Sequence, residues 1–217
     1  MIKGLLFDLD GVIVDTAKYH YYAWKQIADE LNIEFTLQDN ERLKGVSRAR
    51  SFQIILELGG RTMSEAEQEE YCEKKNQIYL DYINKMTEDE ILPGVKPFLT
   101  DAKNKGYRVA LGSASQNAQR ILTLTNLKDY FDVIVDGKTV SAAKPNPEVF
   151  IKGANELGLK NEECIVFEDS VSGIEAAHYA NMLAVGVGTE KDLPMADMHL
   201  DGFCLVTIEK IIGELRY

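Results

Sequence analysis

The stretch KGLLFDLDGVIVDT, residues 3–16, decides the fold, because it places two carboxylates directly after an apolar run. Leu5, Leu6 and Phe7 have the character of a buried β-strand, and Asp8 and Asp10 follow at once with one leucine between them. An unpaired carboxylate costs several kcal/mol to bury, so the pair needs an exposed strand end or a compensating cation. The stretch therefore predicts a buried strand that ends at a charged tip.

Further apolar runs alternate with helical periods along the second half of the chain. Strand-like runs lie at 107–115, 131–137, 163–170 and 182–189, and helix-like segments lie at about 94–105, 116–127, 147–158 and 171–180. This alternation predicts an α/β fold, with a core built on a Rossmann-like, doubly wound parallel sheet. Ligands of such sheets bind beyond the carboxyl ends of the strands, where we expect Asp8, Ser113, Glu168 and Asp169 to meet.

Residues 17 to about 88 interrupt the alternation. They carry Glu, Lys, Gln, Tyr and Leu at helical spacing and contain no convincing strand. We therefore expect an inserted α-helical cap domain at 16–89, with 1–15 and 90–217 forming the α/β catalytic core. The Pro93-Gly94 turn and the segment at Asp15 and Thr16 are the predicted hinge, because both connections must move if the insert opens and closes.

Composition narrows the class of partner. The 217 residues carry a net charge of −11, which disfavours nucleic acid and anionic membranes as partners. No apolar run approaches the roughly 20 residues of a membrane-spanning helix, so a cytoplasmic location is expected. The protein is also expected to be a monomer. Cys72, Cys164 and Cys204 have no CxxC spacing, which indicates neither zinc nor a disulfide framework, and they are interpreted as small buried hydrophobes.

Four short motifs occur in order across the whole chain. They are DLDGVIVDT, the SAS after the second core strand, Lys144 in SAAKPNPEVF, and EDSVSGIEAA. Together they resemble the motifs of the haloacid dehalogenase superfamily, in its phosphotransferase branch with a helical cap. One D-x-D alone is weak evidence, whereas the ordered set at predicted strand ends is specific.

The resemblance implies a role for each motif residue. Asp8 is the candidate nucleophile that forms an aspartyl phosphate, and Asp10 is the candidate general acid and base. Ser113 can donate its hydroxyl to a phosphoryl oxygen, and Lys144 can neutralise charge on Asp8 and the transferring group. The implied cofactor is Mg²⁺, which takes oxygen ligands; the Asp8 carboxylate, the Asp10 carbonyl and Asp169 would supply them, with Glu168 as a ligand or a neighbour that orients one.

Each of these residues has a purely structural alternative. The two aspartates could form a solvated strand end, and Ser113 and Ser115 could be ordinary turn residues. Lys144 alone could be a solvated lysine. Glu168 and Asp169 could cap the helix that starts near residue 171, a role that we favour for Ser170.

The turn LKGVSRARS, residues 43–51, is basic in an otherwise acidic chain. It suits a second phosphate held by the fork of Arg48, and it resembles the turn of sugar-phosphate mutases of the superfamily. By that resemblance the substrate-binding residues on the cap side are Thr16, His20, Trp24, Lys44, Gly45, Val46, Ser47, Arg48, Ser51 and Lys75, and those on the core side, beside Ser113, are Ala114, Ser115 and Asn117. Trp24 could instead be cap core and Arg48 a surface ion pair. Gln116 departs from the mutase pattern, which tends to carry lysine there.

The resemblance implies interconversion of β-D-glucose 1-phosphate and glucose 6-phosphate through an aspartyl phosphate and a 1,6-bisphosphate. A Mg²⁺-dependent sugar-phosphate phosphatase is the alternative, since it uses the same core and differs in how well the cap bars water. A haloacid dehalogenase has no use for Asp10 or the metal. A non-catalytic member is expected to lack a motif residue, and none is missing.

Overall fold

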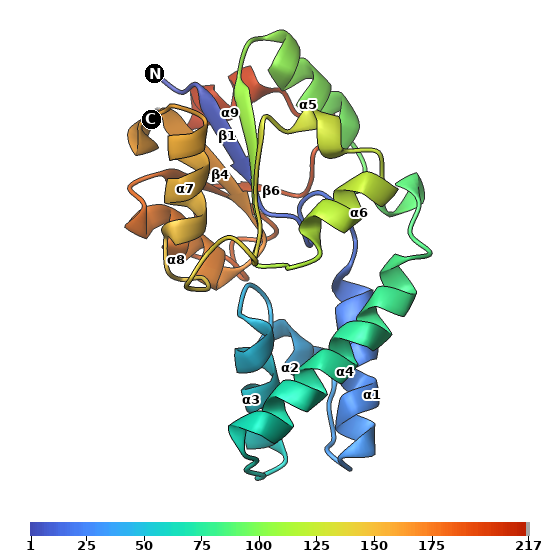
Figure 1. Cartoon of the computed structure of the whole chain (residues 1–217). Helices are drawn as coiled ribbons and strands as arrows, with labels where there is room; N and C mark the ends of the chain where they lie inside the picture. Colours follow the sequence, from blue (N-terminus) through green and yellow to red (C-terminus); the bar gives the residue numbers. More distant parts are fainter. Residues whose placement is uncertain (216–217) are drawn as a thin grey trace.

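A six-stranded parallel sheet forms the centre of the computed structural model, which describes residues 1–215 (Figure 1). The strand order is β3-β2-β1-β4-β5-β6, and every neighbouring pair is parallel. The strands are β1 (Gly4–Phe7), β2 (Arg108–Gly112), β3 (Val133–Val135), β4 (Cys164–Glu168), β5 (Leu183–Val187) and β6 (Met198–Leu200). The predicted α/β class is confirmed. The order reverses between β1 and β4, which is where such sheets bind ligands.

Two helical layers cover the sheet because successive strand side chains point to opposite faces. Leu5 and Phe7 of β1 belong to the apolar cluster under α5, α6 and α9, whereas Leu6 packs under α7 and α8. Phe7 stacks on Phe167 of β4 with ring centroids 4.6 Å apart. Each such fully buried side chain contributes about 1.5–3 kcal/mol. The helices are α5 (Val95–Asn104), α6 (Ala118–Leu124), α7 (Glu148–Glu156), α8 (Val171–Tyr179) and α9 (Ile208–Glu214), with short 3₁₀ turns at Lys128–Tyr130 and Asn161–Glu163.

Four helices between β1 and β2 form a group set apart from the sheet (Figure 1). They are α1 (Ala17–Glu30), α2 (Leu37–Glu41), α3 (Arg48–Leu58) and α4 (Glu65–Ile83). Ser64 begins α4 with a capping box, in which its hydroxyl accepts from the Glu67 amide and the Glu67 carboxylate accepts from the Ser64 amide. The group has an apolar core of its own, where Trp24 stacks on Phe52 at 5.9 Å. The division into core and cap domains stays a prediction.

The two connections between the helical group and the sheet are hydrogen-bonded to each other. The Asp15 amide donates to the Glu90 carbonyl at 2.9 Å, and the Leu92 amide donates to the Ile13 carbonyl at 3.0 Å. A 3₁₀ turn at Glu88–Glu90 precedes this crossing. Gly94 has a φ of +84°, and a Cβ there would lie 2.4 Å from the Phe203 backbone, so only glycine fits beside that loop.

Three sequence expectations differ from the structure. The edge strand β6 was not predicted, because Met198–Leu200 is too short to show a period. Cys164 is buried as expected, but Cys204 is exposed and Cys72 is only half-buried. The expected helix at 116–127 is shorter, since α6 begins at Ala118 and ends at Leu124. Within residues 1–215, no helix combines the length and apolar character needed to cross a membrane.

Candidate active site

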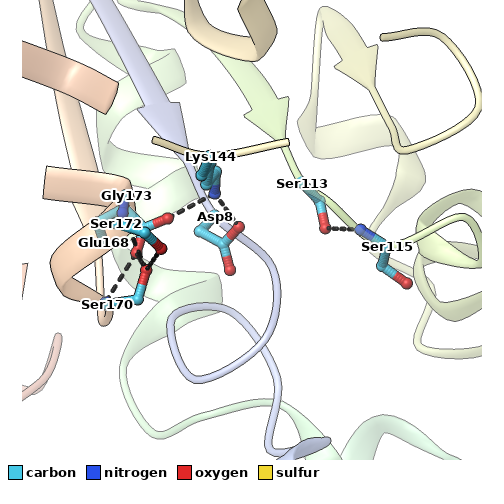
Figure 2. A network of polar contacts seen from close by, with 8 residues as sticks. All are labelled: Asp8, Ser113, Ser115, Lys144, Glu168, Ser170, Ser172 and Gly173. Carbon is cyan, nitrogen blue, oxygen red and sulfur yellow. Dashed lines mark hydrogen bonds and ion pairs between the residues drawn. The ribbon is translucent and has the colours of Figure 1, made fainter. Parts of the chain in front are cut away.

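A buried cation joins two carboxylates at the carboxyl end of the sheet (Figure 2). Lys144 Nζ lies 2.5 Å from Asp8 Oδ1 and 2.5 Å from Glu168 Oε1, and its side chain is 1% exposed. The alternative of a solvated lysine is therefore wrong. Burial opposes the ammonium, but Asp8 and Glu168 outweigh it and raise the pKa of Lys144 above its ordinary value. Burial raises the pKa of Asp8, and the charge of Lys144 opposes that rise, so Lys144 favours the ionised form that a nucleophile needs.

Glu168 is fully engaged by its protein neighbours. One oxygen accepts from Lys144, and the other accepts from the Ser170 amide and the Ser170 hydroxyl, both at 2.8 Å (Figure 2). The Ser170 hydroxyl in turn accepts from the Gly173 amide at 3.1 Å, so the predicted capping role of Ser170 on α8 is confirmed. A Cβ at Gly173 would lie 1.9 Å from the Glu168 carboxylate, so glycine is required there. This geometry favours Glu168 as a residue that positions Lys144.

Asp169 lies against the loop that follows β1. A Cβ at Gly11 would lie 2.3 Å from Asp169 Oδ2, and the same oxygen is 3.4 Å from Lys44 Nζ. Burial, with a further contribution from Glu168, raises the pKa of Asp169 to about 7, while Lys44 opposes the rise. Within residues 1–215, no three side chains of His, Cys, Asp or Glu are grouped so that they could hold a metal ion. A metal here would have to use two carboxylates together with backbone or water oxygens.

Asp10 accepts a hydrogen bond from Thr16 and lies near His20. The Thr16 hydroxyl donates to Asp10 Oδ1, and His20 Nε2 lies 4.0 Å from the same oxygen. Burial raises the pKa of Asp10, and the Thr16 hydrogen bond opposes that rise. A carboxyl with a raised pKa can both accept and return a proton near neutral pH, as general acid–base catalysis requires.

Lys75 contacts His20 and lies against the rings of Trp24 and Tyr79. Its Nζ is 3.0 Å from His20 Nδ1, 5.0 Å from the Trp24 ring and 4.6 Å from the Tyr79 ring. Only 3% of the residue is exposed. Burial lowers the pKa of Lys75 from 10.5 to about 7, and nearby Arg48 adds to the effect. A cation in this position lowers the stability of the fold.

This cost predicts a pH-dependent gain in stability for Lys75→Met. Because the folded pKa is below the unfolded one, the cost is complete below about pH 7 and disappears as the pH rises toward the unfolded pKa. Urea unfolding should therefore show Lys75→Met as more stable than the parent near pH 7, with a smaller difference near pH 10. Lys74→Met is the control, since Lys74 pairs with Glu30 at 2.5 Å on the exposed face of the same helix. A gain independent of pH would contradict the assignment.

The loop after β2 presents amides and hydroxyls to the helical group. Ser113 is fully buried, and its hydroxyl oxygen accepts from the Ser115 amide at 3.1 Å (Figure 2), which leaves its hydrogen free to donate. The Ser115 hydroxyl accepts from the Asn117 amide at 3.2 Å. Both serines thus have the turn role that was the structural alternative. This role is compatible with the proposed donor role of Ser113, because it uses only the hydroxyl oxygen.

Arg48 connects the helical group to that loop. Its Nη2 donates to Asn76 Oδ1 at 2.9 Å and to Gln116 Oε1 at 3.2 Å, and Asn117 Nδ2 donates to the same Asn76 oxygen at 3.1 Å. The ion pair with Glu73 is long, at 3.9 Å. Arg48 therefore bridges the helical group and the loop after β2 through side-chain amides. The alternative of a surface ion pair is wrong.

These residues surround one cavity of about 370 Å³, a size suited to a small polar ligand. The predicted residues that line it are Asp8, Asp10, His20, Trp24, Lys44, Gly45, Val46, Ser47, Arg48, Ser51, Lys75, Ala114, Ser115, Asn117 and Asp169. Thr16, Ser113, Lys144 and Glu168 do not line the cavity, although Thr16 contacts Asp10 and Lys144 contacts Asp8. Trp24, at 2% exposure, belongs to the apolar core of the helical group and also contributes to the cavity wall.

Several lining residues were not predicted. They are Ala17, Asn40, Leu43, Asn76, Tyr79, Gly137 and 140–143, and Gln116 was singled out only as a departure. A signal existed for Tyr79, because it lies four residues after Lys75 and so shares its helix face. Residues 140–143 directly precede Lys144, which is also a usable signal.

The chain is similar to known proteins over nearly its whole length. Residues 2–181 match the family described as haloacid dehalogenase-like hydrolase. The β-phosphoglucomutase of Bacillus subtilis is 41% identical over 98% of this chain and 95% of its own. A crystal structure of β-phosphoglucomutase from Clostridium difficile has a TM-score of 0.94 at 39% identity, covering 99% of this chain and 97% of its own. A phosphorylated carbohydrates phosphatase of Thermotoga maritima is 28% identical over 99% of both chains.

Proposed function

The chain belongs to the haloacid dehalogenase-like hydrolase family, and on this premise we propose that it interconverts β-D-glucose 1-phosphate and glucose 6-phosphate. It is a phosphoryl-transfer enzyme of the β-phosphoglucomutase type. The observation that carries the proposal is that Asp8, which pairs with Lys144, and Arg48 line the same cavity. A sugar carrying two phosphates needs such a cavity, with an anion site for each phosphate.

The reaction follows from two carboxylates with different roles. Phosphorylated Asp8 transfers its phosphoryl group to the 6-hydroxyl of β-D-glucose 1-phosphate, while Asp10 takes the hydroxyl proton. The bisphosphate then turns around in the cavity, so that its 1-phosphate faces Asp8. Asp8 attacks the phosphorus at position 1, and Asp10 returns the proton to the departing sugar oxygen, which gives glucose 6-phosphate and restores the phosphorylated enzyme. Lys144 balances the negative charge on Asp8 throughout.

Membership of this family implies a divalent metal ion, and we propose Mg²⁺. The donors fit, because the carboxylates of Asp8 and Asp169 and the Asp10 carbonyl are hard oxygen ligands of the number that Mg²⁺ takes from proteins. Glu168 would act indirectly, by accepting a hydrogen bond from Lys144 and so positioning it. When bound, the ion would supply positive charge to the phosphoryl oxygens.

The helical group, as the cap of residues 16–89, would keep water from the aspartyl phosphate. Gly45 of the cap turn lies so close to α8 that a Cβ there would be 2.3 Å from the Ser172 hydroxyl. Arg48 reaches Gln116 of the core at 3.2 Å. These contacts join the helical group to the core at the cavity that Asp8 lines, and such a cover favours transfer to a sugar over hydrolysis.

A coupled assay tests the proposal directly. Glucose 6-phosphate should form from β-D-glucose 1-phosphate when the 1,6-bisphosphate and Mg²⁺ are present, and not when Mg²⁺ is removed by a chelator. Release of inorganic phosphate from glucose 1-phosphate, without any need for the bisphosphate, would identify the phosphatase alternative instead.

Replacing Arg48 should separate the two activities. Arg48→Ala removes the fork that holds the phosphate not in reaction, so mutase turnover should fall roughly 10- to 100-fold, the effect of a charge-assisted hydrogen bond. Hydrolysis of a small ester such as p-nitrophenyl phosphate should change far less, because it has no second phosphate. Arg50→Ala is the matched control, since Arg50 pairs with Glu57 at 2.7 Å on the exposed side of α3. Equal losses in both assays would count against the distal phosphate site.

A further inference from the structure

Asn40 is a buried polar residue of α2 that the proposed reaction does not use. It is 7% exposed and lines the cavity. Its backbone is engaged, since the amide donates to the Thr36 carbonyl at 3.1 Å and the carbonyl accepts from the Leu43 amide at 3.0 Å. Its side-chain amide forms no hydrogen bond within residues 1–215, yet it is not one of the unpaired polar atoms there that are sealed from solvent, so it keeps an accessible surface.

The spacing along α2 directs the Asn40 side chain toward the cavity. Residues three and four positions apart share one face of a helix, and Leu43 and Lys44, which follow Asn40 at these spacings, also line the cavity. From this face Lys44 Nζ reaches to 3.4 Å from Asp169 Oδ2 of the core. The other side of the segment is exposed, at Leu37, Gln38, Glu41 and Arg42.

The other side-chain amides on the cavity wall already have partners. Arg48 Nη2 donates to Asn76 Oδ1 and Gln116 Oε1, and Asn117 Nδ2 donates to the same Asn76 oxygen. Asn40 is therefore the cavity-lining amide that has no such bond within residues 1–215. Because buried polar groups in native proteins are nearly always paired, this amide is left for water or for a bound ligand.

The chemistry of an amide defines the group that it would bind. An ionised phosphate oxygen accepts hydrogen bonds and is best matched by a cation such as Arg48. A side-chain amide is neutral, and it offers an oxygen that accepts beside an NH₂ that donates. A hydroxyl both donates and accepts, so it matches the two halves of the Asn40 amide.

We propose that the side-chain amide of Asn40 forms a hydrogen bond with a hydroxyl of the bound sugar, and so selects for the sugar part of the substrate. The inference rests on the proposed function, because it requires a sugar phosphate in the cavity. It deepens that function by giving a specificity role to α2, a helix that carries none of the residues assigned to the phosphates or the metal.

Asn40→Ala tests the inference, because it removes the amide and adds no bulk to the cavity. Calorimetry in Mg²⁺ should show glucose 6-phosphate bound about 3- to 10-fold more weakly than by the parent protein, as for a lost neutral hydrogen bond. Binding of inorganic phosphate should not change. The melting temperature of the ligand-free variant should equal or exceed that of the parent, since no hydrogen bond within the protein is lost and alanine favours the helix.

Monodeoxy analogues of glucose 6-phosphate separate a direct contact from an indirect effect. At least one analogue should bind more weakly than glucose 6-phosphate to the parent protein, but as well as glucose 6-phosphate to Asn40→Ala, because the contact of the missing hydroxyl is already absent there. If every missing hydroxyl costs the same affinity in the parent and the variant, the amide does not contact the sugar and the inference is wrong.

Gln38→Ala is the matched control, since it removes an exposed amide from the other side of the same helix. Its binding of glucose 6-phosphate should equal that of the parent protein. Unchanged glucose 6-phosphate binding by Asn40→Ala would overturn the inference, and so would a lowered melting temperature, which would show that the amide has a partner within the protein. If the parent protein binds phosphate but no sugar phosphate, the proposed function itself fails, and the inference with it.

Discussion

Asp8→Asn is expected to abolish turnover, with a loss on the order of 10⁴-fold or more, as when a nucleophile is removed. The amide has nearly the volume of the carboxylate but cannot attack phosphorus. Treatment of the parent protein with acetyl phosphate and Mg²⁺ should add one phosphoryl group to residue 8, detected by intact mass and peptide mapping. The variant should gain none.

Asp15→Asn provides the control for this experiment. Asp15 lies in the same stretch of sequence, is half-exposed and pairs with Lys18 at 3.3 Å. Its replacement should leave phosphorylation and turnover near the parent level. A phosphoryl group found on Asp10 or elsewhere in Asp8→Asn would contradict the assignment of the nucleophile.

Lys144→Met should produce the largest loss of stability, about 3–5 kcal/mol in the free energy of unfolding. It leaves Asp8 and Glu168 as buried carboxylates without their shared cation. Urea unfolding at pH 7 in a chelator measures the loss, which should shrink at acidic pH as the carboxylates become protonated. Turnover should also collapse, because the charge on Asp8 is no longer balanced.

Two further variants show whether charge is the cause. Lys152→Met removes a partly exposed lysine whose Nζ donates to the Thr139 carbonyl at 2.8 Å, and it should cost little stability. Adding Glu168→Gln to Lys144→Met should recover part of the lost stability, since one unpaired carboxylate is neutralised. No recovery would point to lost packing, for example of the lysine against the Phe150 ring at 4.8 Å, as the cause of the loss.

The sequence predicted the structure well where the type of residue alone determines whether a segment is buried or charged. Leu5, Leu6 and Phe7 predicted the buried strand, and Asp8 at its end predicted an exposed strand end or a compensating cation. In the structure Lys144 supplies a cation beside Asp8. Lys144 was predicted from its motif, but its complete burial follows from α7 and the loop before it. The depth of a lysine is a tertiary property that its neighbours in sequence do not contain.

The sequence was a poor guide where a residue of ordinary type is given its role by packing. Asn76 is unremarkable in a polar helix, and only the packing of α4 turns it toward the cavity. For Glu168 the sequence identified the residue but left its role undecided. Its motif allowed either a metal ligand or an orienting residue, and the hydrogen bonds from Ser170 favour the second.

The two connections between the helical group and the sheet are hydrogen-bonded to each other, and this restricts how the helical group can move relative to the sheet. Hydrogen bonds from Asp15 to Glu90 and from Leu92 to Ile13 tie the outgoing and returning strands into one ribbon, so neither can lengthen or slip past the other. We therefore expect the helical group to tilt about these two paired connections, with the torsions of both connections changing together. Arg48 should accordingly return to the same amide partners each time the helical group closes, and a change that breaks either backbone hydrogen bond should alter the opening and closing rates alike.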